Sequence, residues 1–260
     1  MPRANRHFLP NHVWHISHRC HKQEFLLRFA RDRQRWLHWF FEARKRYDLC
    51  MLHYTVTSNH IHLLVYDRGD DAIPQSMQLI AGRSGQEFNQ CKKRKGAFWE
   101  DRYHATAVDT GEYLARCITY IDLNMVRHSV VLHPSLWPSG GYYKIQNPPQ
   151  RYRIIDLEQL TLLIGSADIA QLQHDHRGWV EAALTQNKCS REKCWSESVA
   201  VGSEEYVAEV SATLGERASG RKQNCEDGLY VLQEDRTPYS TVFDMEKGLI
   251  SIKNDPCRDK

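Results

Sequence analysis

The sequence lacks any long apolar segment. No uninterrupted hydrophobic run approaches the roughly 20 residues of a membrane-spanning helix, and the start, MPRANRHFLPNH, has no apolar core of the kind found in secretory signals. We therefore expect a cytoplasmic protein with no membrane partner. With 260 residues, 41% of them hydrophobic, the chain is long enough to bury a sizeable core.

The eight cysteines form no C-x-x-C pair, which argues against a zinc ribbon or a dithiol redox motif. Their scattered positions fit a reduced compartment. Cys189 and Cys194 are the closest pair. A zinc knuckle there would need ligands that the sequence does not identify, so we interpret both as small apolar residues. Internal repeats and low-complexity blocks are also absent.

Acidic residues are scarce in the first part of the chain. Residues 1–153 contain 23 Lys and Arg against 13 Asp and Glu, a net charge of +10, whereas residues 154–260 contain 12 against 19, a net charge of −7. A basic excess is typical of proteins that bind phosphate backbones, although a solvated basic surface has the same composition. The first part is therefore a candidate for nucleic-acid binding.

The hydrophobic pattern of the first part alternates strands and helices. We predict strands over 12–19, 97–108 and a pair within 49–67 that turns at residues 57–59, and helices over 28–47, 74–91 and 110–128. Gly96 should stop the second helix. This order predicts an α+β fold with helices covering one face of a largely antiparallel sheet. Beyond Pro148 and Pro149 we predict an acidic, mostly helical extension over 151–260 that includes a helix over 203–214, and we assign no fold to the last forty residues.

Two histidines lie one residue apart in the predicted strand TSNHIHLL. On a strand, His60 and His62 point to the same face with their Cα atoms about 6 to 7 Å apart, while Ile61 points to the other. Two imidazoles so spaced can bind one cation. Half-exposed histidines of an ordinary strand show the same pattern, so the motif alone is weak.

The predicted helix after Thr110 carries Tyr120 and Asn124 one turn apart. Placed over the histidine strand, the Asn124 amide oxygen would complete a three-ligand metal site while Tyr120 presents its hydroxyl group. This arrangement suits attack of a tyrosine oxygen on a phosphodiester, with Mg²⁺ or Mn²⁺ as the divalent metal and Zn²⁺ as an alternative. The sequence does not identify the base that removes the tyrosine proton, and an ordinary surface tyrosine fits the helix equally well.

The stretches TSNHIHLLV and YIDLNMVR together resemble the single-tyrosine HUH transposases, and more narrowly the REP-associated tyrosine transposases. HVWHISHR, FWEDRYHATAV and LWPSGGYY occur in the expected order, and the resemblance covers roughly residues 5 to 145. It implies a ferredoxin-like HUH domain over 1–150, a divalent metal, hairpin-bearing single-stranded DNA as substrate and a transient 5′-phosphotyrosine. By resemblance, His60, His62 and Asn124 are metal ligands and Tyr120 is the nucleophile. NMVRHS stands where the family often has NPVRAG.

A groove for single-stranded DNA needs basic and aromatic side chains. The candidates are Arg83, Lys92, Lys93, Arg94, Lys95, Trp99, Arg102, Tyr103, Arg116 and Arg127, with Arg3 and Arg6 near the start. The lysine run is also explained as a helix end, and Trp99 as a core residue. By resemblance we expect a homodimer, and the sequence leaves open whether Tyr120 acts with the histidines of its own chain.

Three functions fit these observations. The first is metal-dependent cleavage and strand transfer of single-stranded or hairpin DNA through Tyr120. The second is a noncatalytic nucleic-acid-binding regulator that retains the fold, which would not need His60, His62, Tyr120 and Asn124 together. The third is a metal-dependent nucleotide hydrolase, for which Tyr120 would be dispensable.

Overall fold

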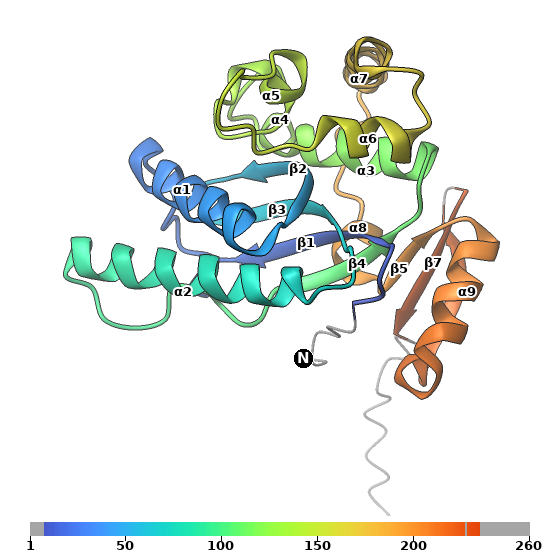
Figure 1. The fold of residues 1–260 in the computed structure, drawn as a ribbon, viewed down its shortest axis with the longest axis horizontal. Helices are drawn as coiled ribbons and strands as arrows, with labels where there is room; N and C mark the ends of the chain where they lie inside the picture. The colour runs from blue at the N-terminus through green and yellow to red at the C-terminus, as the bar shows by residue number, and fades with distance from the viewer. Residues whose placement is uncertain (1–7, 227, 235–260) are drawn as a thin grey trace, which may run out of the picture.

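The computed structural model describes residues 8–226 and 228–234 (Figure 1). Its first part contains β1 (Val13–Arg19), η1 (His21–Gln23), α1 (Ala30–Tyr47), β2 (Cys50–Val56), β3 (His60–Tyr66), α2 (Ala72–Lys92) and β4 (His104–Val108). The four strands lie in the order β2-β3-β1-β4, and every neighbouring pair is antiparallel. This is the predicted ferredoxin-like α+β arrangement.

The rest of the chain adds helices and three more strands to the same sheet. Its elements are α3 (Glu112–Asp122), α4 (Asn124–Arg127), η2 (Pro134–Leu136), α5 (Tyr142–Gln146), α6 (Leu157–Ile164), α7 (Ile169–Thr185), α8 (Cys194–Glu197), β5 (Ala200–Gly202), α9 (Glu204–Leu214), η3 (Gly215–Ala218), β6 (Arg221–Glu226) and β7 (Leu229–Glu234). Strand β5 pairs in parallel with β4, and the sheet continues through β7 to β6. The mostly helical character predicted for the extension is confirmed.

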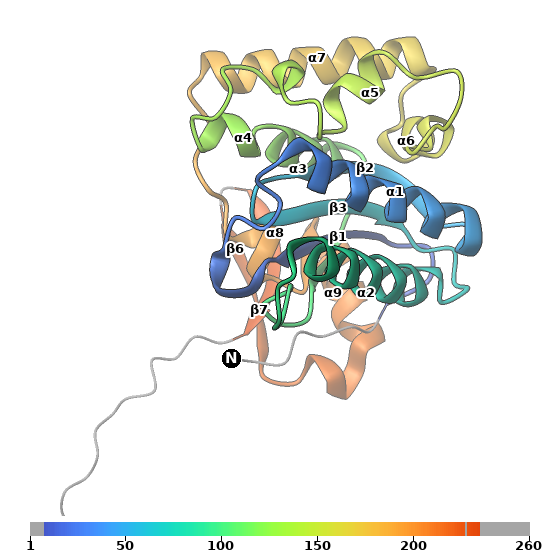
Figure 2. The ribbon, with the colours of Figure 1, turned by 90° about the vertical axis from the view of Figure 1, so that its left-hand side faces the viewer.

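Helices cover both faces of the sheet rather than the one face that we expected. Helices α1 and α2 lie side by side on the first face, whereas α3 covers the second, with α7 in an outer layer (Figures 1 and 2). Successive residues of β2 show the two environments. The Tyr54 ring lies 5.7 Å from the Phe40 ring of α1, and His53 bonds to Asp122 of α3. The second face carries the polar residues of interest.

The extension shares the hydrophobic core of the first part. Leu160, Trp195 and Val201 have no exposed surface and belong to one cluster with Ile16 and Ile61 of the central strands. Full burial of each such side chain is worth about 2 kcal/mol, so the two parts stabilise each other. None of the helices in the described ranges is long and apolar enough to cross a membrane.

Several element ends differ from the predictions. Helix α2 ends in a left-handed residue at Lys93 (φ 50°), and Arg94 N–H closes the turn on Asn89 O (2.8 Å), so Gly96 is not the stop. Strand β4 begins only at His104, and Trp99 makes an isolated bridge with Cys20. The third helix begins at Glu112 and is interrupted at residue 123, short of the predicted end at 128.

Candidate active site

The structure brings together the four residues that the sequence singled out. His60 and His62 leave the same face of β3, and their ring centroids are 4.9 Å apart. Asn124 Nδ2 lies 3.1 Å from His62 Nε2, and the ring centroid of Tyr120 is 6.0 Å from that of His62. All four belong to one chain, so Tyr120 lies beside its own histidines.

The hydrogen bonds of His60 define which ring nitrogen carries its proton. Nδ1 lies 2.8 Å from the Asn59 side-chain oxygen and 3.0 Å from the Thr57 hydroxyl. The Thr57 hydroxyl donates its own proton to the His60 carbonyl (2.8 Å), so both partners of Nδ1 are acceptors. The proton of neutral His60 therefore sits on Nδ1, which leaves an unprotonated lone pair on Nε2.

His62 reaches the same state through a second histidine. His15 Nδ1 lies 2.7 Å from the Trp195 carbonyl, which can only accept, so neutral His15 carries its proton there. His15 Nε2 then accepts from His62 Nδ1 at 2.9 Å. This leaves the lone pair of His62 on Nε2, as in His60, and there it accepts a hydrogen bond from Asn124 Nδ2 (3.1 Å). His15, His60, His62 and Asn124 are called the β3 cluster below.

Burial keeps these histidines neutral. It lowers the pKa of His60 to about 3 and that of His15 to about 4, and it lowers the pKa of His62 well below its usual value. Arg19 and Arg127 add to the effect on His60 and His62 by charge repulsion. The neutral imidazole, and not the imidazolium ion, is the form that binds metal ions.

Tyr120 is enclosed by the β3 cluster and by the extension. Only 5% of its surface is exposed. Its ring centroid lies 6.3 Å from those of His15 and Trp195, and the Arg127 guanidinium carbon lies 4.3 Å above the ring centre. Burial raises the pKa of Tyr120, while the positive charges of Arg127 and Arg191 oppose that rise. The arginines thus favour the phenolate that a nucleophile needs.

The interruption after α3 places Asn124 at the start of a new turn. Leu123 (ψ 0°) separates α3 from α4, and the Tyr120 carbonyl accepts a hydrogen bond from the Arg127 guanidinium (3.1 Å). Arg127 Nε also donates to the carbonyl of Cys189 (2.9 Å) in the extension. Arg127 therefore fixes the helix break beside the candidate nucleophile.

The donor set fits a weakly held divalent cation. Asn124 Oδ1 is buried and has no hydrogen-bond partner among the described residues, and the His60 and His62 lone pairs lie nearby. Within the same residues, no group of three or more His, Cys, Asp or Glu side chains could hold a metal ion. A metal here would thus depend on two imidazoles, the Asn124 amide and oxygen atoms from outside the chain, a set compatible with Mn²⁺ or Mg²⁺.

The predicted DNA-binding residues fall into two groups. Arg83, Lys92, Lys93, Arg94, Lys95, Trp99, Arg102 and Tyr103 lie on α2 and the segment that leads to β4, whereas Arg116 and Arg127 flank Tyr120 on α3 and α4. Trp99 is half-buried and stacks on His18 with centroids 4.1 Å apart, and Tyr103 is 7% exposed, so both pack against the protein. Arg3 and Arg6 lie outside the described residues.

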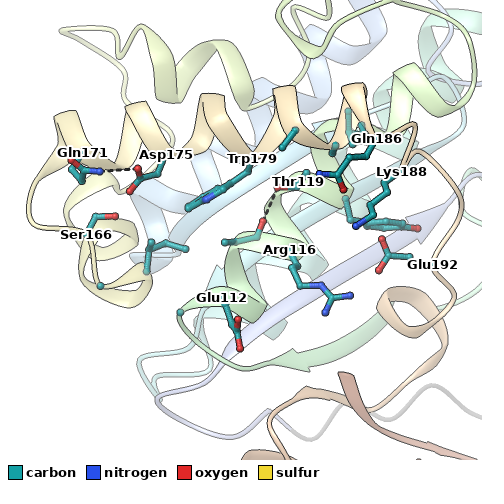
Figure 3. A pocket seen from close by; sticks show the side chains of 18 of the residues that line it. Glu112, Arg116, Thr119, Ser166, Gln171, Asp175, Trp179, Gln186, Lys188 and Glu192 are labelled. Atoms are coloured by element: carbon teal, nitrogen blue, oxygen red, sulfur yellow. Dashed lines mark hydrogen bonds between the residues drawn. The ribbon is translucent and has the colours of Figure 1, made fainter. Parts of the chain in front are cut away.

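A groove runs between α3 and α7 and reaches Tyr120. Its volume is about 1120 Å³. Trp179 points from α7 toward Thr119 of α3, Arg116 projects from α3, and Lys188 lies near the other end of the groove (Figure 3). Acidic side chains also line it, namely Glu112, Asp175 and Glu192. The groove is therefore a mixed polar surface that leads from solvent to the buried tyrosine.

Sequence reasoning missed several residues of this site. His15 was read only as part of a strand, and Arg19, the register partner of His60, was not singled out. Trp195 and Arg191 come from the extension, to which the sequence assigns no catalytic role. The one available signal was the alternation in HVWHISHR, which places His15 and Ser17 on one strand face.

A second buried histidine cluster lies against the same helix. Asp122 Oδ1 and Oδ2 accept from His53 Nε2 (2.8 Å) and His176 Nε2 (2.7 Å), and Gln146 Nε2 donates to His176 Nδ1 (3.0 Å). Burial alone would raise the pKa of Asp122, but the two histidines outweigh it and lower the pKa to about 2. These four residues, called the Asp122 cluster below, connect β2, α3, α5 and α7.

Comparison with known proteins finds similarity over the first part of the chain. Residues 9–124 match the family model described as transposase, IS200 like. A solved REP-associated tyrosine transposase bound to a REP hairpin is 19% identical, with 55% of this chain and 84% of that chain covered and a TM-score of 0.47. A candidate transposase of Deinococcus radiodurans is 13% identical, with 40% and 83% covered and a TM-score of 0.32. No curated protein matches the chain.

Proposed function

Because residues 9–124 match the family model of IS200-like transposases, we propose that the protein cleaves and rejoins single-stranded DNA through a covalent bond to Tyr120. The observation that carries this proposal is the position of Tyr120. Its ring lies 6.0 Å from that of His62 and directly beneath the Arg127 guanidinium. A tyrosine that served only as packing would need neither neighbour.

In the proposed reaction Tyr120 attacks the scissile phosphate. The phenol loses its proton, its oxygen bonds to phosphorus, and the bond from phosphorus to the 3′ oxygen breaks, so that a 5′-phosphotyrosine and a 3′ hydroxyl group result. Attack by a 3′ hydroxyl reverses the step and rejoins DNA. Arg127 and Arg191 lower the cost of the phenolate, and Arg127 holds the helix break next to the reacting oxygen.

His60, His62 and Asn124 are the proposed metal ligands. When bound, Mg²⁺ or Mn²⁺ would polarise a nonbridging oxygen of the scissile phosphate. The histidines hold their Nδ1 protons on Asn59 and His15, which places both lone pairs on Nε2. The His62 lone pair accepts a hydrogen bond from Asn124 Nδ2 (3.1 Å) in this structure, and a bound metal would replace that bond. The buried, unpartnered Oδ1 of Asn124 supports a third ligand at this place.

The groove between α3 and α7 is the proposed path of the DNA strand. Arg116 and Lys188 are exposed and can contact phosphates, and Trp179 is half-buried and offers part of its ring for stacking. The resemblance of the histidine and tyrosine motifs to REP-associated transposases supports a hairpin-bearing substrate. The single chain contains the histidines and Tyr120 together, which supports action within one subunit whether or not a homodimer forms.

The test is a covalent adduct assay. The wild-type protein should form a denaturation-resistant adduct with 5′-labelled and 3′-labelled hairpin DNA in Mn²⁺, with only the label on the 3′ side of the cut retained. Tyr120→Phe should abolish the adduct and keep DNA binding. Tyr113→Phe, on the same helix, is the matched control and should keep the adduct.

Two results would reject this function. Tight binding of every hairpin tested without an adduct would favour the noncatalytic regulator. Cleavage that survives Tyr120→Phe would favour the metal-dependent nucleotide hydrolase.

A further inference from the structure

His62 is connected to the C-terminal extension through one other buried histidine. His15 of β1 has no exposed surface. It accepts from His62 Nδ1 (2.9 Å) and donates to the Trp195 carbonyl (2.7 Å), which lies 180 positions away in the sequence. The three groups form a continuous chain of hydrogen bonds from α8 to β3.

We propose that His15 is a positioning residue that holds Nε2 of His62 toward the metal, and that the extension is thereby part of the metal site. The proposal rests on the proposed function in its assignment of His62 as a ligand. Hydrogen bonds from the second nitrogen of a ligating histidine fix its tautomer and ring orientation. No other side chain of the described residues is recorded as bonding to Nδ1 of His62.

The direction of the chain follows from its carbonyl end. A carbonyl oxygen cannot donate, so a proton must lie on His15 Nδ1. The neutral ring then has only a lone pair at Nε2, and the proton between the two rings must come from His62 Nδ1. The reverse arrangement would place two lone pairs 2.7 Å apart at the Trp195 carbonyl. Only one tautomer of His62 is compatible with this geometry.

The extension holds the Trp195 carbonyl firmly in place. The Trp195 side chain is fully buried, and its Nε1 donates to Glu192 (3.0 Å). The Thr106 hydroxyl of β4 donates its one proton to the Ser198 carbonyl (2.7 Å) and lies 3.3 Å from the Trp195 carbonyl. Strand β5 begins two residues after Ser198 and pairs with β4. The carbonyl therefore has little freedom to leave His15.

His104 provides a matched control. It lies on β4, and its Nε2 bonds to the Ser198 carbonyl (2.9 Å), so it anchors the same extension by the same kind of hydrogen bond. It makes no hydrogen bond to His62. A general loosening of the extension would affect His15 and His104 variants alike, whereas the proposed role belongs to His15 alone.

The first experiment measures Mn²⁺ binding to the full chain by electron paramagnetic resonance, without DNA. His15→Leu should weaken Mn²⁺ binding by about 10- to 100-fold, and His15→Gln, whose amide can accept and donate along the same chain, should recover part of the loss. His104→Leu should bind Mn²⁺ like the wild type. Wild-type affinity in His15→Leu, or an equal loss in His104→Leu, would overturn the proposal.

The second experiment uses only the wild-type protein, so it does not depend on whether a variant folds. In the metal-free wild type, long-range ¹H–¹⁵N spectra should show His15 and His62 protonated on Nδ1. A proton on Nε2 of His62 would refute the positioning role. If the proposed function fails because His62 is not a metal ligand, His62→Ala will bind Mn²⁺ as tightly as the wild type. This result does not depend on the tautomer of His62, so it can be told apart from failure of the positioning role.

Discussion

The β3 cluster and the Asp122 cluster are both buried and rich in histidine, and both contact the segment that carries Tyr120. They differ in one chemical group. The Asp122 cluster is centred on a carboxylate that accepts from two histidines. The β3 cluster contains no carboxylate, and its histidines donate to Asn59 and to His15. In the Asp122 cluster the carboxylate binds one ring nitrogen of each histidine, and His53 Nδ1 is left without a partner among the described residues. In the β3 cluster the unprotonated nitrogens, Nε2 of His60 and of His62, lie beside the Asn124 amide, to which His62 is bonded.

The two clusters also differ in the space that is available for a ligand. The remaining nitrogen of His53, Nδ1, faces the backbone at Gly141, where even a Cβ atom would approach to 2.6 Å. No cation fits there, and only glycine allows the contact. The β3 cluster instead adjoins Tyr120 and the groove between α3 and α7. Lone pairs that face available space, rather than the number of buried histidines, mark the candidate site.

Removal of a ligand from the β3 cluster should have the largest effect on activity. We expect His62→Ala to abolish the Tyr120–DNA adduct, because the loss of a ligand should reduce activity by more than the 10- to 100-fold that is typical when a residue that only supports a ligand is changed. Thermal unfolding should change far less than in Asp122 variants, since no buried charge loses its partner. Adduct yield and melting temperature measured on the same preparation test both statements. His176→Ala, from the other cluster, is the control and should keep the adduct in its folded fraction.

The Asp122 cluster should show the opposite behaviour. Asp122→Asn removes a buried charge that accepts two hydrogen bonds, and we expect a loss of about 3 kcal/mol in the free energy of unfolding. Urea denaturation at pH 7 measures this loss. Asp175→Asn, on α7 beside His176, should change stability by less than about 0.5 kcal/mol. Equal stabilities for the two variants would mean that the carboxylate is not the centre of a structural cluster.

Much of this comparison could be anticipated from the sequence, but not its decisive contacts. The period-two pattern of β3 placed His60 and His62 on one face, and the helical spacing placed Tyr120 near Asn124. The alternation of β1 places His15 and Ser17 on one strand face, but it does not say that this face is buried. The Trp195 carbonyl could not be foreseen, because a main-chain atom from a distant segment has no sequence signature. The helix break at Leu123 was also missed, since it depends on the Arg127 side chain bonding to the Tyr120 carbonyl.

The two clusters should also respond to different pH ranges. Burial holds the pKa of His15 at about 4 and that of His60 at about 3, whereas both rise to about 6.5 on unfolding. The unfolded chain therefore binds more protons below pH 6.5, and stability falls by up to about 1.4 kcal/mol per pH unit for each histidine. Asp122, with its pKa lowered to about 2, loses its contribution only below its ordinary value near 4.

Urea denaturation of the metal-free protein between pH 7.5 and 5 separates these contributions. His60→Gln should reduce the slope of the free energy of unfolding against pH by the contribution of one histidine, which is up to about 1.4 kcal/mol per pH unit. Asp122→Asn should shift the whole profile downward and leave its slope unchanged in this range. An unchanged slope in His60→Gln would show that His60 is not held neutral in the folded protein.

The smallest predicted effect concerns the groove that adjoins the β3 cluster. Arg116 is exposed on α3, and the exposed Lys188 lies beside Gln186 and Glu192 in the groove (Figure 3). If a single strand contacts both, each substitution to Gln should reduce the slope of log affinity against log salt by about 0.7. The Tyr120→Phe background allows binding to be measured by fluorescence anisotropy without cleavage. Lys45→Gln, an exposed charge of α1 on the opposite face of the sheet, should leave the slope unchanged; an equal loss there would mean that DNA follows the basic surface in general and not the groove beside the tyrosine.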